Sequence, residues 1–512
     1  MIDTLSNLIA SHPSDARAIG APDRPWLSYG ALRTLTDQVR AQLLKAGIGR
    51  GDRVAIVLPN GPEMATAFFT IAQTATTAPL NPAYRLDEFD FFLADLKAVA
   101  IVLPEGHDGP ALQAAQKAGL VVLRLSNAAG DPAGAFTLRA EGSASGTPDE
   151  AAPGAGDTAL ILHTSGTTSR PKIVPLLHSN VAASARNIRS SLALTAADRC
   201  LNMMPLFHIH GLVAAVSSSL SAGASVWCAP GFDALRFFGW MDAAKPSWYT
   251  AVPTMHQTIL GRAARNAETI AKNPLRFIRS SSASLPAQVM LELARTFGAP
   301  VIEAYGMTEA AHQMASNPLP PRGQKPGSVG VEAGPLVRIA HEIENHLMPF
   351  GIGEIVICGP NVTLGYEGNP DANAKNFFQA EGRRWFRTGD QGSLDDEGYL
   401  SLTGRLKEII NRGGEKVSPL EVDGILMDHP AVQQVVTFAM PHPKLGEEVA
   451  AAVVLREGMQ TDEAAIRKFC AERLADFKVP RRVVILTEIP KGATGKLQRI
   501  GLAEKLGLMP TA

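Results

Sequence analysis

The sequence contains little cysteine. Its four cysteines are scattered along 512 residues, at Cys200, Cys228, Cys358 and Cys470. No two of them form the close pair that a zinc knuckle or a small disulfide framework requires, so neither is supported. Few and distant thiols are typical of a reduced, intracellular protein.

An excess of charge of either sign is also absent. The 48 Lys and Arg residues almost balance the 49 Asp and Glu residues, which leaves a net charge of −1. This balance excludes the basic surface of a dedicated nucleic-acid binder, so we expect no nucleic-acid partner. With 46% hydrophobic and 19% charged residues, the chain is typical of folded globular proteins, and its length indicates more than one domain.

Long hydrophobic runs are missing as well. The stretch of residues 200–232 carries no Asp, Glu, Lys or Arg, but proline, glycines and serines interrupt it. A membrane helix needs about 20 predominantly apolar residues, so we expect no membrane span. The N-terminus lacks the basic segment and apolar core of a signal peptide, and the C-terminus lacks a peroxisomal address. The expected location is the cytoplasm.

Short runs rich in Val, Ile and Leu alternate with helical patterns over the first four hundred residues. This alternation predicts an α/β fold whose layered sheets are mostly parallel and buried on both faces. After Arg405 the elements shorten and mix, with a last helix expected from Lys496. We therefore predict a large N-terminal domain of residues 1–405 and a small, mobile α+β domain of residues 406–512. Residues 128–157, rich in Gly, Ala, Ser and Pro, are expected to form a loop.

The strongest local signal follows an apolar strand, where residues 164–172 read TSGTTSRPK. Hydroxyls and closely spaced backbone N–H groups can surround phosphate oxygens, and a lysine adds a point charge. The loop is not a Walker A motif, and by itself an ordinary Ser/Thr-rich turn explains it equally well. The candidate phosphate-binding residues are Thr164, Ser165, Gly166, Thr167, Thr168 and Lys172.

Four further motifs follow this loop: EAYGMTE at 303–309, TGD at 388–390, GRLKE at 404–408 and GK at 495–496. In this order the motifs resemble those of the adenylate-forming superfamily, which contains acyl-CoA synthetases, luciferases and the adenylation domains of peptide synthetases. The resemblance spans most of the chain. Several stretches are most similar to the oxalate–CoA ligase branch: HTSGTTSRPK, MPLFHIHGL, SWYTAVPT, RFIRSSSASLP, YGMTEAAHQMASNPLP and INRGGEKVSPLEVD.

The resemblance implies a ligase that uses ATP, Mg2+ and CoA. A carboxylate attacks the ATP α-phosphate to give an acyl-adenylate, and the CoA thiol then displaces AMP. In this scheme Tyr305 stacks on adenine and Gly306 allows close approach, while Asp390 binds the ribose hydroxyls. Arg405 reaches the ribose and phosphates. The other residues that the resemblance assigns to the nucleotide are Ser282, Ala283, Glu303, Ala304, Met307 and Thr308.

The resemblance also assigns catalytic and conformational roles. Glu309 would hold Mg2+, a hard cation that prefers oxygen ligands. Lys496 would neutralise charge at the α-phosphoryl group during attack. Lys407 matches the hinge about which the small domain rotates between the two half-reactions. Gly413 and Gly414 match the stretch that the pantetheine of CoA passes.

The acid is predicted from the polar residues near the adenylate. Ser280 and Ser282 belong to the run SSSAS at 280–284, and His208 matches a family histidine at the mouth of the acyl pocket. Together with His312, they suit a very small, doubly charged acid better than an apolar one. We predict oxalate, with other short dicarboxylic, medium-chain fatty or 4-coumarate-like acids as alternatives. Arg279 could also serve, but an arginine at a strand start is more often on the surface.

Two other classes of function stay open. An adenylation enzyme could load a separate carrier protein instead of CoA. A non-catalytic binding protein could use the same fold, although Lys172, Glu309, Asp390, Arg405 and Lys496 are all present. For either enzyme we expect a monomer or a homodimer.

Overall fold

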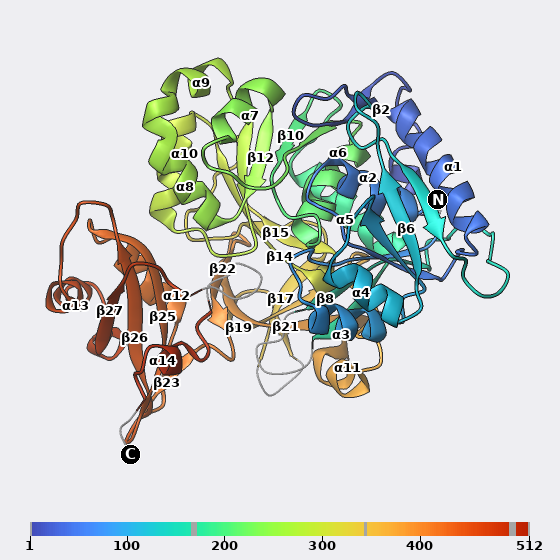
Figure 1. Ribbon diagram of the computed structural model, residues 1–512. Coiled ribbons are helices and arrows are strands. Elements are labelled where there is room, and N and C mark those ends of the chain that lie inside the picture. The colour runs from blue at the N-terminus through green and yellow to red at the C-terminus, as the bar shows by residue number, and fades with distance from the viewer. Residues whose placement is uncertain (1–2, 165–170, 342–345, 491–497, 510–512) are drawn as a thin grey trace.

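The computed structural model describes residues 3–164, 171–341, 346–490 and 498–509. A large α/β body contains three sheets, and a smaller unit with its own sheet follows it in the chain. Figure 1 shows the orange and red elements of the smaller unit gathered to one side of the larger body. This arrangement confirms the predicted fold class of a large N-terminal and a smaller C-terminal domain.

The sheet that positions the candidate site has nine strands. Its central neighbours are parallel, and antiparallel pairs lie at both edges. In spatial order the strands are β16 (Val331–Glu332), β15 (His312–Ser316), β14 (Val301–Met307), β13 (Phe277–Ser280), β12 (Trp248–Ala251), β10 (Arg199–Asn202), β11 (Ser225–Cys228), β1 (Arg17–Gly20) and β2 (Leu27–Ser28).

A second sheet of seven strands also has a parallel centre, flanked by two antiparallel hairpins. Its order is β7 (Thr137–Glu141), β6 (Val121–Ser126), β5 (Ala100–Pro104), β3 (Arg53–Ile56), β4 (Thr76–Pro79), β8 (Thr158–Thr164) and β9 (Lys172–Leu177). Strand β7 lies inside the segment 128–157 that was expected to be a loop. That expectation was wrong for residues 137–141, because they pair with β6 along the sheet edge.

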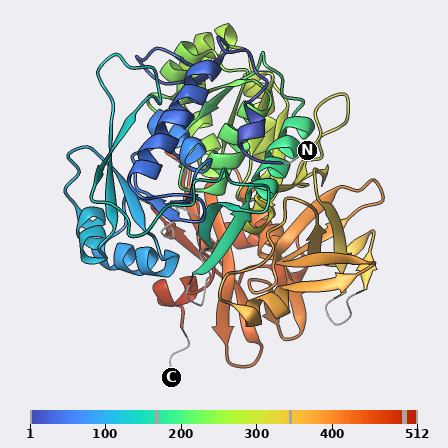
Figure 2. The ribbon, with the colours of Figure 1, turned by 90° about the vertical axis from the view of Figure 1, so that its right-hand side faces the viewer.

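The third sheet differs from the other two, since all its strand pairs are antiparallel. Turned by 90°, the molecule shows these orange strands as a separate layer below the green and yellow ones (Figure 2). The sheet contains β18 (Leu347–Met348), β17 (Leu336–Ala340), β19 (Gly351–Cys358), β21 (Arg383–Leu394), β20 (Phe377–Ala380) and β22 (Leu400–Arg405).

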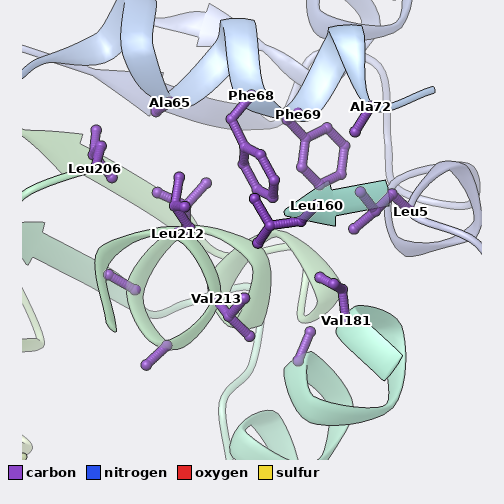
Figure 3. Packing of buried hydrophobic residues seen from close by; sticks show 14 of the residues in the cluster. Leu5, Ala65, Phe68, Phe69, Ala72, Leu160, Val181, Leu206, Leu212 and Val213 are labelled. Carbon is purple, nitrogen blue, oxygen red and sulfur yellow. The ribbon is translucent and has the colours of Figure 1, made fainter. Parts of the chain in front are cut away.

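Helices cover the sheets and join them through one large hydrophobic core. Phe68 and Phe69 of α2 meet Leu212 and Val213 of the π-helical segment η2, with Leu160 of β8 beside them (Figure 3). The helical elements of the larger body are η1 (Ser6–Leu8), α1 (Tyr29–Lys45), α2 (Pro62–Ile71), α3 (Leu86–Leu96), α4 (Pro110–Lys117), α5 (His178–Ser191), η2 (His210–Ser217), α6 (Ser218–Ser221), α7 (Phe237–Ala244), α8 (Pro253–Ala263), η3 (Ala264–Asn266), α9 (Ala267–Lys272), α10 (Ala287–Phe297), η4 (Thr308–Ala310) and α11 (Pro370–Asn376).

Local sequence explains where several helices begin. The Ser28 hydroxyl accepts a hydrogen bond from the Ala31 N–H at the start of α1, as an N-cap residue does. Proline occupies the first turn of α2, α4, α8 and α11, where its missing N–H is not needed.

The C-terminal unit is a five-stranded sheet with helices. Its elements are β23 (Ile410–Arg412), β24 (Glu415–Val417), α12 (Pro419–Met427), β25 (Val432–His442), β26 (Gly446–Leu455), α13 (Glu463–Ala471), η5 (Asp476–Lys478), β27 (Arg482–Leu486) and α14 (Leu502–Lys505). The final helix begins at Leu502, later than predicted, because Gly501 adopts a left-handed conformation just before it. Among the described residues, no helix is long and apolar enough to cross a membrane.

Candidate active site

Two parallel strands, β12 and β13, end together at the edge that carries the predicted site, and β14 beside them continues to Met307. Ser280, the last residue of β13, is aligned with Ala251 of β12 and with Glu303 of β14. In open α/β sheets, ligands bind outside the carboxyl ends of the strands. The polar residues that follow these strands are therefore at the place where this class of fold binds ligands.

One end of the site is built around Asp390, which is 9% exposed. The Tyr305 hydroxyl donates a hydrogen bond of 2.5 Å to its Oδ2, and Arg405 Nε lies 3.3 Å from its Oδ1. Asp390 on β21 and Arg405 on β22 face each other across a strand pair. Burial raises the pKa of Tyr305, and the Asp390 charge raises it further. A buried carboxylate is thus held between a cation and a neutral donor.

Gly306, next to Tyr305, has no room for a side chain because of the protein's own backbone. A Cβ on Gly306 would lie 2.0 Å from the carbonyl oxygen of His312, because β14 and β15 pair closely at a bulge. Close approach at this position was predicted, but the neighbour in the structure is backbone. Met307 and Thr308 continue the same segment and are partly exposed.

Glu309 forms a second polar group near the first. Its side chain is buried in η4, and the Tyr366 hydroxyl donates a 2.8 Å hydrogen bond to its Oε1. The Lys172 ammonium lies 4.3 Å from the centre of the Tyr366 ring. Burial raises the pKa of Glu309, which the Tyr366 hydrogen bond and the charges of Arg405 and Lys172 counteract. Burial also lowers the pKa of Lys172.

Tyr366 was missed in the sequence because no recognised motif contains it. It follows Gly365 in the connection between β19 and α11, more than fifty positions after Glu309. An aromatic residue in such a connection gives no signal of its own, so only the three-dimensional contact identifies it.

Glu303 is buried in β14, at the position where the pairing with β13 ends. Its Oε1 accepts a 2.8 Å hydrogen bond from the Leu285 N–H, and burial raises its pKa to about 8. The Ser281 hydroxyl donates to the Ala304 carbonyl at 2.7 Å. These two contacts fasten the loop after β13 to β14. Ala283, in the same loop, is exposed.

The opposite end of the site collects imidazoles and hydroxyls. His210 Nδ1 lies 3.0 Å from Ser282 Oγ, and the His210 and His312 rings are 5.1 Å apart. Ser282, Ala311 and His312 have positive φ angles of 73°, 47° and 108°. Such backbone strain in residues other than glycine clusters at functional sites. The structure thus brings together two of the predicted acid-binding residues, Ser282 and His312.

His210 joins this group although the sequence analysis singled out only His208 from the same stretch. His208 lies just before η2, partly buried, with its ring 4.4 Å from that of Phe207. Ser280 is fully buried. The described residues contain no group of three His, Cys, Asp or Glu side chains that could hold a metal ion.

The expectation that Arg279 lies on the surface was wrong. Arg279 is the third residue of the four-residue strand β13, which lies inside the sheet between β12 and β14, and its side chain is fully buried against His210 and Gln313. Its Nη2 donates to Gln313 Oε1 at 3.2 Å, and its Nη1 lies 3.4 Å from His210 Nε2.

The predicted phosphate loop is described only at its two ends. Thr164 and Lys172 are the last paired residues of the β8–β9 hairpin. Ser165, Gly166, Thr167, Thr168 and the predicted catalytic Lys496 lie outside the described residues.

The predicted hinge follows β22 directly. Burial is the main cause that lowers the pKa of Lys172, and the charge of Lys407 lowers it further. Gly413 and Gly414 form the turn between β23 and β24, with φ angles of 60° and 102° that favour glycine. A hairpin turn therefore accounts for both glycines without a ligand.

Comparisons with known proteins agree with this architecture. Residues 7–367 match the AMP-binding enzyme family, and residues 421–496 match the AMP-binding enzyme C-terminal domain. The ATP-bound crystal structure of MatB from Rhodopseudomonas palustris superposes with a TM-score of 0.87 at 29% identity, covering 99% of each chain.

Two relatives extend the similarity to higher identity. An oxalate–CoA ligase of Arabidopsis thaliana is 45% identical over 97% of this chain and 97% of its own. An oxalate–CoA ligase of Saccharomyces cerevisiae is 42% identical over 90% of this chain and 88% of its own. With a family match over most of its length and relatives of this identity, the chain belongs to the AMP-binding enzyme family.

Proposed function

We propose that this protein is an ATP-dependent acid–CoA ligase that converts oxalate to oxalyl-CoA through an oxalyl-adenylate. The observation that carries the proposal is that two different ends meet around β14, whose Tyr305 contacts Asp390 of the third sheet. Asp390, Arg405, Glu309 and Lys172 supply charged groups for a nucleotide, and the other end offers hydroxyls and imidazoles to a small acid. The likeness to the two oxalate–CoA ligases supports the choice of acid.

In the first half-reaction a carboxylate oxygen of the acid attacks the α-phosphorus of ATP. The bond between the α-phosphorus and the bridging oxygen breaks, and pyrophosphate leaves with the electron pair. Asp390 accepts hydrogen bonds from the ribose, Tyr305 covers the adenine, and the backbone of residues 303–308 lines the nucleotide. The loop from Thr164 to Lys172 surrounds the phosphates, and Lys496 stabilises the charge that develops on the α-phosphoryl oxygens.

The residues present fit a magnesium ion at the phosphates. Mg2+ is usually bound through one or two carboxylates together with phosphate oxygens. Glu309 presents one such carboxylate, which Tyr366 orients by its hydrogen bond. The bound ion supplies neutralisation of the phosphate charge, and Glu309 is the residue of this chain that would hold it.

In the second half-reaction the CoA thiol attacks the acyl carbon, the bond to AMP breaks, and the thiol proton passes to solvent. Lys496 must leave the site before the thiol can enter. We propose that the domain of residues 406–512 rotates about Lys407 relative to residues 1–405, which brings Gly413 and Gly414 alongside the pantetheine. The cytoplasmic location and the state of monomer or homodimer stay predictions.

Oxygen labelling tests this chemistry directly. Oxalate carrying 18O in its carboxylates is incubated with ATP, Mg2+ and CoA, and AMP and oxalyl-CoA are analysed by mass spectrometry. Attack by the carboxylate on the α-phosphorus places one 18O atom in AMP for each oxalyl-CoA formed. Label in inorganic phosphate or none in AMP contradicts an adenylate intermediate. Replacing CoA by a carrier protein in the same assay tests the second candidate function.

A further inference from the structure

Arg279 is a fully buried cation that has no carboxylate partner among the described residues. It makes two contacts, to Gln313 and His210, and its Nε has no hydrogen-bond partner in the described part of the chain. Burial lowers the pKa of Arg279 to about 9, which still leaves the guanidinium charged at neutral pH. An uncompensated buried charge is costly, and proteins normally pair such groups.

Arg276, a nearby arginine in the chain, shows how this protein pairs an arginine with a carboxylate. Arg276, three positions earlier, has its Nε 3.0 Å from the Asp198 carboxylate, which is itself largely buried. Glu303, on the strand next to Arg279, cannot serve as the counter-ion, because burial raises its pKa to about 8 and keeps it neutral at pH 7. The positive charge of Arg279 therefore stands alone within its surroundings in the described chain.

A short chain of contacts connects this charge to the acyl end. Arg279 Nη1 lies 3.4 Å from His210 Nε2, which Thr250 Oγ1 also contacts at 2.6 Å. The other ring nitrogen, Nδ1, lies 3.0 Å from Ser282 Oγ. An arginine N–H can only donate, so Nε2 accepts at this contact and Nδ1 can donate toward Ser282. Ser282 has a positive φ angle and a π-helical turn begins at His210, two features that are frequent at functional sites.

We infer that Arg279, acting through His210 and Ser282, creates a subsite for the second carboxylate of a small dicarboxylic acid. The Ser282 hydroxyl, oriented by the His210 N–H, donates to the carboxylate. Arg279 and His210 are positioning residues, and the charge of Arg279 compensates that of the substrate. The protein then selects small dianions over monoanions of the same size. This inference rests on the proposed function, since it assigns the substrate class of the same site.

The matched pair of acids for the test is oxalate and oxamate. The two have nearly the same size and shape, but oxamate carries a neutral amide in place of the second carboxylate. Pyrophosphate release is measured with each acid for the unaltered protein, and we expect a preference for oxalate of about 100-fold in kcat/KM. Arg279→Gln should remove about 100-fold from the oxalate value, mainly through KM, and change the oxamate value less than about threefold. The KM for ATP should not move.

Two further variants separate charge from structure. Arg279→Lys keeps the charge and should retain at least about a tenfold preference for oxalate. Arg276→Gln removes a paired arginine three positions away and should lower the melting temperature without altering the preference. If Arg279→Gln does not fold, His210→Gln decides the question, and a selective loss with oxalate is again the expected result.

The opposite outcomes are distinct. Equal losses with oxalate and oxamate in Arg279→Gln or His210→Gln, or no loss with either acid, overturn the subsite. An unaltered protein that activates both acids equally overturns the subsite but leaves the ligase activity standing. If the unaltered protein releases no pyrophosphate with either acid, the proposed function itself is overturned.

Discussion

The two ends of the candidate site treat charge in opposite ways. At the nucleotide end Asp390 is ion-paired with Arg405, and Glu309 receives a hydrogen bond from Tyr366 with Lys172 nearby. At the acyl end Arg279 is buried without a carboxylate partner in the described chain. A preassembled, balanced end suits a co-substrate that never varies, whereas an unbalanced charge favours the one acid that can neutralise it.

The largest effect is expected at Lys496, which is proposed to act at the α-phosphoryl group, where the nucleotide and the acid react. Lys496→Ala should lower adenylate formation about 100- to 1,000-fold, because one preorganised positive charge is removed from the α-phosphoryl group. Binding of ATP should persist, since the Asp390 and Tyr305 contacts are untouched. Pyrophosphate release and ATP binding are measured separately, with Lys505→Ala in α14 as the control. Unchanged pyrophosphate release would refute the role of Lys496.

The second-largest effect is expected from a change at the nucleotide end, which should alter the binding of ATP but not that of the acid. Asp390→Asn keeps the shape of the side chain but removes the charge that faces Arg405. The KM for ATP should rise about tenfold while the KM for oxalate stays constant, because charge-assisted hydrogen bonds are stronger than neutral ones. The matched control is Asp395→Asn, which alters an exposed carboxylate paired with Lys325. A larger change in the KM for oxalate than for ATP contradicts the division into two ends.

A third prediction concerns Glu303, whose burial should make the stability of the protein depend on pH. The pKa of Glu303 is about 8 when folded and near 4.5 when exposed, so folding takes up a proton between these values. Its contribution to the free energy of unfolding is present below about pH 4.5 and is lost as the pH rises through about 8. Glu303→Gln mimics the protonated acid, so its melting temperature should exceed that of the unaltered protein by a few degrees at pH 8–9.

The comparison of the two proteins at pH 5 provides the reference, because Glu303 is neutral there and the difference should nearly vanish. The control Glu268→Gln alters an exposed residue paired with Lys272 and should show no such trend. A melting-temperature difference that is independent of pH would contradict the neutral state of Glu303, and with it the isolation of the Arg279 charge.

The smallest effect is expected from Tyr366→Phe, which removes one hydrogen bond and keeps the ring beneath Lys172. That hydrogen bond lowers the pKa of Glu309, so its loss raises this pKa. The half-saturating Mg2+ concentration for pyrophosphate release should rise about threefold, and more at lower pH, where the carboxyl is more often protonated. Tyr84→Phe is the control, because Tyr84 stacks on Phe92 of α3 and belongs to neither end of the site. An unchanged Mg2+ requirement would separate Glu309 from the metal.

The residues within motifs were predictable, because each motif is a short contiguous stretch whose residue types indicate its chemical role. Tyr305, Glu309, Asp390 and Arg405 were all placed in one site from their motifs, and the structure brings them near one another. The fold class was predictable for the same reason, since alternating strand and helix patterns are local. The antiparallel third sheet and strand β7 were not, because pairing direction depends on partners distant in sequence.

The burial of Arg279 shows the limit of such reasoning most clearly. An arginine in a short strand carries no local sign that its side chain is buried against residues distant in sequence, here His210 and Gln313. The role of His210 likewise became visible only through its contacts with Thr250 of β12 and with Arg279 and Ser282 of β13 and the loop after it. Long-range packing, which no short pattern encodes, therefore determines the acyl end more than the nucleotide end.

The most direct test of the whole account is pyrophosphate release that depends on ATP and CoA across a panel of acids. The panel contains oxalate, malonate, acetate, octanoate and 4-coumarate, with Mg2+ kept well above oxalate because oxalate chelates it. We predict a large preference for oxalate. A preference for octanoate or 4-coumarate would contradict the polar, positively charged acyl end, and release with none of the acids would contradict the ligase itself.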